Sequence, residues 1–228
     1  MTKPVFNQLQ LMGLDTSHLI ELYPNHFVHQ QVAEPIKALQ LASQQAGFDL
    51  RLASSFRSFA RQQLIWNDKT QGKRPVFNRQ QQQVDLSKYS EIDAINKICI
   101  YSAIPGFSRH HWGTDFDVYD AKQFDAENRP QLTPDEYKSG GPNYPMYLWL
   151  LENMSQFGFV HVYTDNQQTG VAAEPWHISH LPTAKIAQQA FKLSECTQIL
   201  SEQPLAYKQT LLDNLADLYQ TYVEAYYV

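Results

Sequence analysis

The feature that most constrains this chain is a pair of polar segments: SRHHWGTDFD at residues 108–117, and EPWH, which ends at His177. A zinc ion that does chemistry usually takes three protein ligands from His, Asp, Glu and Cys, and keeps its fourth position for water. His110, Asp117 and His177 can supply such a set. Glu174 can accept the proton of the bound water. A metal site of this kind requires a fold that brings the two segments together.

The spacing alone does not require a metal, because a chain with eight histidines places some of them near acids by chance. Most such histidines lie on the surface or in the core with ordinary hydrogen bonds. The local context favours the metal: Gly113 permits a turn after His110, and the alternation over residues 115–119 predicts a strand with one buried face. Asp115 and Asp117 then point to the same face, where one can ligate while the other supports it or stays in water.

The two segments resemble the VanY-like zinc D-alanyl-D-alanine carboxypeptidases, whose patterns are S-x-H-x-x-G-x-A-x-D and E-x-W-H. The similarity extends to SFRSFARQ at residues 55–62, like the family's S-G-Y-R-S-Y-x-x-Q, and to GFVHVY at residues 158–163, like its G-F-x-x-x-Y. In total it spans about residues 27–181. The residues that match the first two patterns are Ser108, His110, Gly113, Asp117, Glu174, Trp176 and His177.

The resemblance implies an activity and a set of roles. It implies zinc on His110, Asp117 and His177, and hydrolysis of peptidoglycan stem peptides that end in D-alanine. Glu174 corresponds to the catalytic base, and Arg57 to an anion-binding residue at the site. The expected substrate contacts are Arg57, Ser108, Gln62 and Trp176.

Two positions depart from the family pattern. Asp115 stands where the family usually has Ala, and it adds a carboxylate beside the metal strand. This carboxylate can alter the charge balance of the metal or contact one of its ligands from behind. Ser179, two residues after His177, stands where relatives often carry Arg. Both departures weaken the prediction of the substrate, whereas the prediction of the fold is unaffected.

Reasoning from the residues leaves the role of Arg57 open. We expect Arg57 in the first turn of a helix, where the helix dipole disfavours a positive charge. An anionic partner is therefore expected to hold it, either Asp117 or another structural carboxylate, or a ligand. The resemblance favours an anion at the active site, where a planar guanidinium can hold a carboxylate or stabilise an oxyanion.

The hydrophobic patterns predict an α+β domain with a small, mostly antiparallel sheet flanked by helices. On a regular strand Glu174 and His177 would point to opposite faces, so Pro175 has to bend the segment that carries them.

We expect three parts: an N-terminal arm (1–25), a zinc peptidase domain (26–181) and a helical C-terminal segment packed on it (182–228). Helices are expected at 26–46, through 63–66, at 91–103, from 145, from 183 and after 204; strands are expected at 48–53, 115–119, 159–163 and 171–181.

Other stretches are predicted to carry no chemistry. Residues 70–88 are polar and rich in turn signals, which favours a solvated insertion over a mobile flap. Residues 121–142 are expected to form a second excursion, and residues 165–170 a turn. Cys99 and Cys196 have no metal-type spacing and fit buried small hydrophobes better than a disulfide.

Composition limits the partners. The net charge is -5, and no basic stripe with interleaved aromatic residues is present, so we expect no nucleic acid. No run of about 18 apolar residues predicts a membrane span. No export signal can be read in the first 25 residues, and action in the periplasm or cell wall stays open for a chain whose leader was removed. A monomer is expected, with a dimer through the tyrosine-rich C-terminal end as the alternative.

Two alternatives to D-alanine removal remain at this stage. The same motifs can serve an L,D-carboxypeptidase or a cell-wall endopeptidase or dipeptidase. A module that binds cell-wall peptides without cutting them is the alternative from another class. Glu174 argues against that module, since binding alone needs no base.

Overall fold

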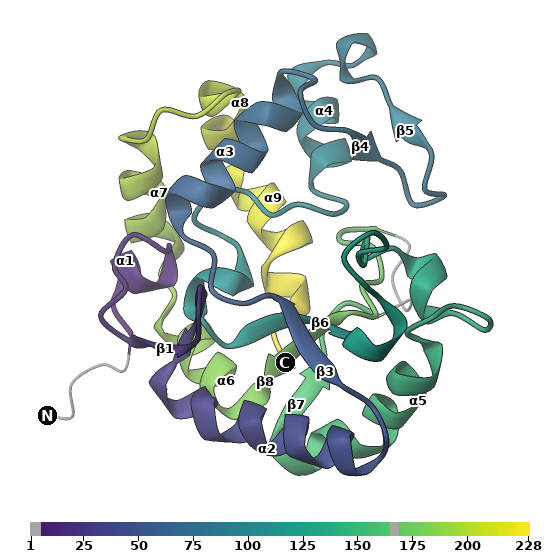
Figure 1. Ribbon diagram of the computed structural model, residues 1–228. Helices are drawn as coiled ribbons and strands as arrows, with labels where there is room; N and C mark the ends of the chain where they lie inside the picture. Colours follow the sequence, from purple (N-terminus) through teal and green to yellow (C-terminus); the bar gives the residue numbers. More distant parts are fainter. Residues whose placement is uncertain (1–5, 165–168) are drawn as a thin grey trace, which may run out of the picture.

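The computed structural model describes residues 6–164 and 169–228. At its centre lies a four-stranded antiparallel sheet with the strand order β3-β6-β8-β7 (Figure 1). The predicted α+β class with a small antiparallel sheet is therefore confirmed. The strands of this sheet are β3 (Leu50–Ser54), β6 (Asp115–Asp120), β7 (Phe159–His161) and β8 (His177–His180).

The two faces of this sheet differ in chemistry because side chains alternate along each strand. Phe116 and Val118 of β6 point to one face and belong to a hydrophobic cluster with residues of α2 (Ala33–Gln45) and α5 (Tyr144–Asn153). These helices lie along the lower part of Figure 1. The opposite face of β6 carries polar side chains, and it faces the interior of the molecule.

A second hydrophobic cluster occupies the upper part of Figure 1. It joins α3 (Phe59–Thr70) and α4 (Glu91–Ile98) to the C-terminal helices through buried residues such as Trp66 and Ile95. The helices α3 and α4 begin at serine caps, because Ser58 accepts the N–H of Arg61 and Ser90 that of Asp93. The C-terminal helices of this cluster are α7 (Leu193–Ser201), α8 (Lys208–Asp213) and α9 (Leu215–Tyr222), whereas α6 (Leu181–Ala190) belongs to a third cluster.

The N-terminal arm is packed onto the domain. The helix α1 (Gln8–Leu11) is capped by Asn7, and buried Leu11 packs in a cluster with Trp112 and residues of α6. The strands β1 (Leu19–Tyr23) and β2 (His26–His29) form an antiparallel hairpin. The expected boundary after residue 25 therefore falls inside this hairpin.

Several predicted boundaries need correction. The helix expected over 26–46 begins only at Ala33, after β2 and the short η1 (Gln30–Val32). The helix expected over 91–103 ends at Ile98. The strand expected over 171–181 is regular only in β8, and the helix expected to begin at a Thr183 cap already begins at Leu181. The last predicted helix is divided into α8 and α9.

Residues 70–88 pack more tightly than their composition predicts. They contain a small hairpin of β4 (Val76–Phe77) and β5 (Gln83–Val84), and Val76 is buried in the cluster around α3 and α4. The side chain of Arg79 donates to the backbone oxygen of Gly170 at 2.6 Å. The predicted solvated insertion is therefore wrong for this hairpin, which is fixed at both its base and its turn.

The remaining predictions concern small features. Cys99 and Cys196 are buried free thiols, as predicted. Residues 121–142 form an irregular excursion, also as predicted, whereas most of the expected turn at 165–170 lies outside the described residues.

Within the part of the chain that the structure describes, no helix has the length and apolarity needed to cross a membrane. The short helical turns are η2 (Leu86–Lys88), η3 (Arg109–Trp112), η4 (Ala121–Gln123), η5 (Pro134–Tyr137), η6 (Met154–Phe157) and η7 (Glu224–Tyr226).

Candidate metal centre

The polar face of the central sheet brings the predicted metal ligands together. Asp117 of β6 and His177 of β8 are direct partners across the antiparallel pair. His110 comes from η3, which ends at Gly113 in the left-handed conformation with φ 70°. A Cβ atom at Gly113 would lie 2.7 Å from the backbone nitrogen of His29, so only glycine allows this turn. The ligand atoms of His110, Asp117 and His177 all lie within 4.8 Å of one another.

The hydrogen bonds of the two histidines leave one ring nitrogen of each directed at Asp117. His110 Nδ1 is 3.0 Å from the backbone oxygen of Ser55, which can only accept, so the lone pair of His110 is on Nε2. That Nε2 atom lies 3.4 Å from Asp117 Oδ2, and His177 Nδ1 lies 3.3 Å from Asp117 Oδ1. His110 is therefore in the tautomer that a metal ligand needs.

Two buried atoms of this group indicate a fit to a cation. Asp117 Oδ1 and His177 Nδ1 lack a hydrogen-bond partner among the described residues. Leaving such groups unsatisfied in the interior costs about 1–3 kcal/mol each. A set of two imidazoles and one carboxylate also matches the donors of zinc sites that keep an open position. The residues present therefore fit a zinc ion.

The electrostatics of Asp117 and His110 suit metal binding. Burial opposes ionisation of Asp117, but the neighbouring His110 and His177 outweigh it and hold the pKa of this carboxyl well below its usual range. Burial lowers the pKa of His110, which favours its neutral form. An ionised carboxylate and a neutral imidazole are the forms in which these side chains bind metals.

Glu174 lies beside the ligand His177 because the chain turns sharply between them. The backbone N–H of His177 donates to the oxygen of Glu174 at 3.0 Å, which confirms the bend expected at Pro175. Glu174 Oε2 is 3.7 Å from His177 Nδ1. Burial raises the pKa of Glu174 to about 8. A carboxyl group whose pKa lies near neutrality is suited to accept and release a proton.

Arg57 lies directly before α3, because Ser58 is the cap residue; the expected position in the first helical turn is wrong. Its Nη1 donates to Gln62 Oε1 at 3.0 Å and its Nη2 to Ser54 Oγ at 3.2 Å. Its Nη2 is also 3.8 Å from Asp117 Oδ2. Arg57 thus has a structural carboxylate as neighbour and still faces the cavity described next, so both interpretations of its role remain compatible with its position.

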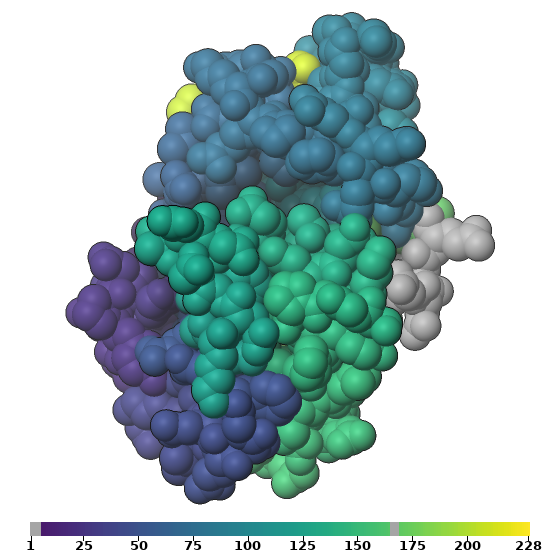
Figure 2. Space-filling view, turned by 45° about the vertical axis from the view of Figure 1, so that its right-hand side comes forward, coloured from purple at the N-terminus to yellow at the C-terminus, as the bar shows by residue number. Residues whose placement is uncertain are grey.

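A cavity of about 470 Å³ opens onto this group. Arg57, Ser108 and Trp176 line it together with Glu174 and the three ligand residues. Figure 2 shows the furrow at the surface between the upper part of the molecule, which carries the β4–β5 hairpin, and the lower part, which carries the excursion at 121–142. Both insertions contribute to the wall, through Phe77 and Leu132 among others.

Gln62 is the one expected substrate contact that the structure places elsewhere. Its side chain is fully buried and does not line the cavity. Its amide donates to the backbone oxygen of Ala103 at 2.7 Å, and its oxygen accepts from Arg57. Gln62 therefore orients Arg57, and a direct contact with substrate would require this arrangement to open.

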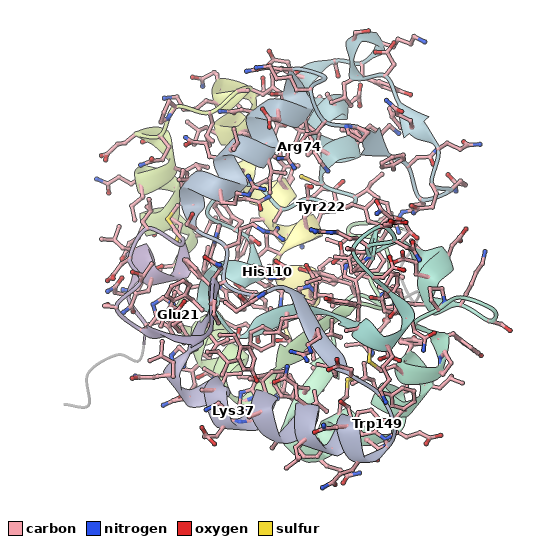
Figure 3. All side chains as sticks on the ribbon, in the orientation of Figure 1. Glu21, Lys37, Arg74, His110, Trp149 and Tyr222 are labelled. Carbon is pink, nitrogen blue, oxygen red and sulfur yellow. The ribbon has the colours of Figure 1, made fainter. Side chains whose placement is uncertain are left out.

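Sequence reasoning missed two tyrosines of the cavity wall. Tyr163 ends the GFVHVY motif, and its ring centroid lies 4.8 Å from that of His177. Tyr222 of α9 lines the cavity from the C-terminal segment, which was expected to carry no chemistry. Figure 3 shows His110 and Tyr222 near the centre of the molecule. The motif itself could have drawn attention to Tyr163, whereas no local signal distinguishes Tyr222 from a packing residue.

Comparison with known proteins places the chain in a class. It belongs to the family described as VanY: D-alanyl-D-alanine carboxypeptidase, whose model matches residues 25–183. An uncharacterized protein of Haemophilus influenzae is 33% identical over 127 residues, which cover 55% of this chain and 94% of that protein. A D-alanyl-D-alanine carboxypeptidase of Enterococcus faecalis is 27% identical over 149 residues, which cover 63% of this chain and 46% of that protein.

Solved structures share the fold. The structure described as VanYB in complex with D-Alanine-D-Alanine has a TM-score of 0.52 and 24% identity, and the match covers 81% of this chain and 89% of that one. A mutant of the vancomycin resistance D,D-pentapeptidase VanY in complex with Zn(II) also has a TM-score of 0.52, with 23% identity and coverage of 80% and 92%.

Proposed function

We propose that this protein is a zinc-dependent carboxypeptidase that removes the terminal D-alanine from peptidoglycan stem peptides. One observation carries the proposal: His110, Asp117 and His177 direct their ligand atoms to one point at the wall of a cavity that also contains Glu174 and Arg57. The membership of the family supports the reaction class, and the VanYB complex with D-Alanine-D-Alanine supports the class of substrate.

His110, Asp117 and His177 would hold the zinc ion. When bound, zinc would lower the pKa of a water molecule and polarise the scissile carbonyl. Glu174 would accept a proton from the attacking water and pass it to the leaving amine, for which its buried position and raised pKa are suitable.

The cavity wall offers groups that can orient a peptide. The guanidinium of Arg57 can hold the terminal carboxylate of the substrate or the oxyanion that forms during hydrolysis. Trp176 is 6% exposed, and its ring lies 5.9 Å from that of Tyr137, so it forms a fixed apolar surface on the same wall. Ser108 is buried at 3% exposure and lines the cavity near His110.

Mass spectrometry of purified muropeptides incubated with the zinc-loaded protein, with and without a chelator, tests the proposal. Loss of one alanine from pentapeptide stems, abolished by the chelator, is the expected result. Loss of the terminal alanine from tetrapeptide stems indicates an L,D-carboxypeptidase, and release of a dipeptide or an internal cut indicates a dipeptidase or an endopeptidase. Peptide binding without any cleavage would overturn the proposal in favour of a binding module.

A further inference from the structure

A buried ion pair lies directly behind the ligand His177. Asp115 Oδ1 is 3.0 Å from His177 Nε2 and 2.7 Å from Arg109 Nε. The other carboxylate oxygen accepts the hydroxyl of Thr114 at 2.5 Å. Asp115 is 0% exposed and Arg109 is 3% exposed. Two opposite charges at this depth are costly unless each is well paired, which makes the arrangement sensitive to the loss of either partner.

The contact with Asp115 determines how His177 presents its second nitrogen. A carboxylate can only accept, so His177 Nε2 carries the proton and its lone pair is on Nδ1, on the side of Asp117. A carboxylate in this position fixes the tautomer and the orientation of a metal-binding imidazole and raises its basicity. Asp115 therefore acts on the metal position through His177.

Arg109 is in turn held by residues of β8, of α6 and of the C-terminal tail. Its Nη2 donates to Ser179 Oγ at 2.8 Å, on the strand next to β6. Its Nη1 lies 3.4 Å from the backbone oxygen of Tyr226. With its amide oriented to satisfy both neighbours, Gln188 accepts from Arg109 Nη1 at 3.0 Å and donates to the oxygen of Val228 at 3.1 Å.

Aromatic contacts connect the same C-terminal residues to the ligand. The ring centroid of Tyr226 lies 5.0 Å from that of Tyr163, which in turn packs against His177. The hydroxyl of Tyr226 donates to the oxygen of Val171 at 3.1 Å. Tyr226 lies outside the segment 25–183 that matches the family, and yet it contacts Arg109 and Tyr163, the neighbours of Asp115 and His177.

We propose that Arg109 and Asp115 are a positioning pair for His177, and that residues 222–228 hold this pair in place. The affinity for zinc then depends on a carboxylate that is not a ligand and on a C-terminal tail beyond the family segment. The inference rests on the proposed zinc site, in which His177 binds through Nδ1.

The variant Asp115→Asn tests the pair, because the amide has nearly the same shape and lacks the charge. We expect its dissociation constant for zinc, measured by competition with a chromophoric chelator, to rise about 10- to 100-fold. A dissociation constant within twofold of wild type would overturn the role of Asp115.

Asp120→Asn is the matched control. Asp120 lies on the same strand and is 2% exposed, but its Oδ1 accepts the backbone N–H groups of Asp49 and Lys122, away from the metal ligands. We expect it to lower the melting temperature and leave zinc affinity unchanged. If both variants lose zinc equally, the effect is general destabilisation of β6 and the positioning role is refuted.

Deletion of residues 224–228 tests the role of the tail. We expect the shortened protein to keep the circular dichroism spectrum of the wild type. Its dissociation constant for zinc should be at least several-fold higher. If the shortened chain does not fold, Gln188→Leu decides, since it removes the amide that links Val228 of the tail to Arg109 and leaves the chain intact. Wild-type zinc affinity in the folded variant would refute the role of the tail. Failure of the proposed function has a different signature, because the wild-type protein itself would then take up no zinc.

Discussion

Arg57 donates its Nη1 hydrogen to Gln62 Oε1 at 3.0 Å, and this bond fixes the direction of the guanidinium at the cavity wall. Gln62 is itself anchored, because its amide donates to the backbone oxygen of Ala103. A buried glutamine with both ends bound is a rigid support. The position of Arg57 is therefore set by the protein before any substrate arrives.

Arg57→Lys is expected to keep its zinc and to lose roughly 100-fold in kcat/KM, as for removal of one stabilising donor in other active sites. A lysine preserves the charge, but it cannot donate to Gln62 and to a substrate anion in the fixed fork of a guanidinium. Zinc content and steady-state kinetics on the same sample provide the test. Turnover at the wild-type rate would mean that Arg57 is structural and pairs with Asp117 alone.

Gln62→Ala is expected to lower kcat with zinc retained, because Arg57 loses its orienting partner. Loss of the buried amide also leaves the oxygen of Ala103 unpaired, which should cost about 1–3 kcal/mol of unfolding free energy. Gln63→Ala, one position further along α3, serves as the control, since Gln63 instead donates to the oxygen of Pro204. Equal kinetic effects of the two variants would contradict a role for Gln62 in orienting Arg57.

His110→Ala, Asp117→Ala and His177→Ala are each expected to purify without zinc, because two remaining ligands bind zinc weakly. His111 and His180 provide controls that should keep the metal. Both are buried and hydrogen-bonded, His111 to the N–H of Gly106 and His180 to the hydroxyl of Thr183, so their alanine variants should be less stable. Full zinc occupancy in any of the first three variants would remove that residue from the site.

The stability of the protein should depend on pH through His29, which is 0% exposed. Its Nδ1 accepts the N–H of Gln31 at 3.1 Å, and burial, with His18 and His180 nearby, lowers its pKa from 6.5 to about 4. Between these two values the unfolded chain binds a proton that the native state does not. This contribution to stability is therefore fully present above pH 6.5 and is lost as the pH falls toward 4.

The variant His29→Asn checks this dependence, because asparagine keeps an acceptor at the cap and does not titrate. The unfolding free energy of both zinc-free proteins is measured in urea at roughly pH 7 and pH 5. Its decrease from pH 7 to pH 5 should be about 2 kcal/mol smaller in the variant than in the wild type. The other histidines titrate in both proteins, so they cancel in this comparison. Equal losses on acidification would rule His29 out as the source.

The sequence predicted those parts of the candidate site that depend on local backbone geometry. Gly113 marks a turn that only glycine can make, the alternation along β6 places Asp115 and Asp117 on one face, and Pro175 accompanies the bend before His177. These signals depend on backbone geometry within a few residues. They favoured a metal site on this face, and the family resemblance then selected the three residues whose ligand atoms the fold brings together.

The N-terminal boundary of α2 was wrong because two structures share one pattern. Val28, Val32 and Ile36 have helical spacing, but Val28 lies in β2, which pairs with β1, and its side chain packs in the same cluster as Ile36. The hairpin turn at Asn25, with φ 67°, allows this pairing, and asparagine is one of the few residues that adopt such an angle readily. Tertiary pairing therefore outweighed the local helical signal.

Other features depend on contacts between distant parts of the chain. Arg109 is next to His110 in sequence, but its partner Asp115 follows from the direction of η3, and its contact with Tyr226 follows from the path of the C-terminal tail. Tyr222 reaches the cavity only because α9 packs against α3 and α4. No spacing or composition rule indicates such contacts.

The most direct test of the account is Glu174→Gln, with metal content and rate measured on the same sample. The amide has nearly the same shape as the carboxylate but cannot accept the proton of water, so we expect full zinc occupancy and a loss of hydrolysis of about two to four orders of magnitude. Loss of zinc together with activity would instead make Glu174 a ligand. Zinc retained with wild-type turnover of the stem peptide would contradict the account.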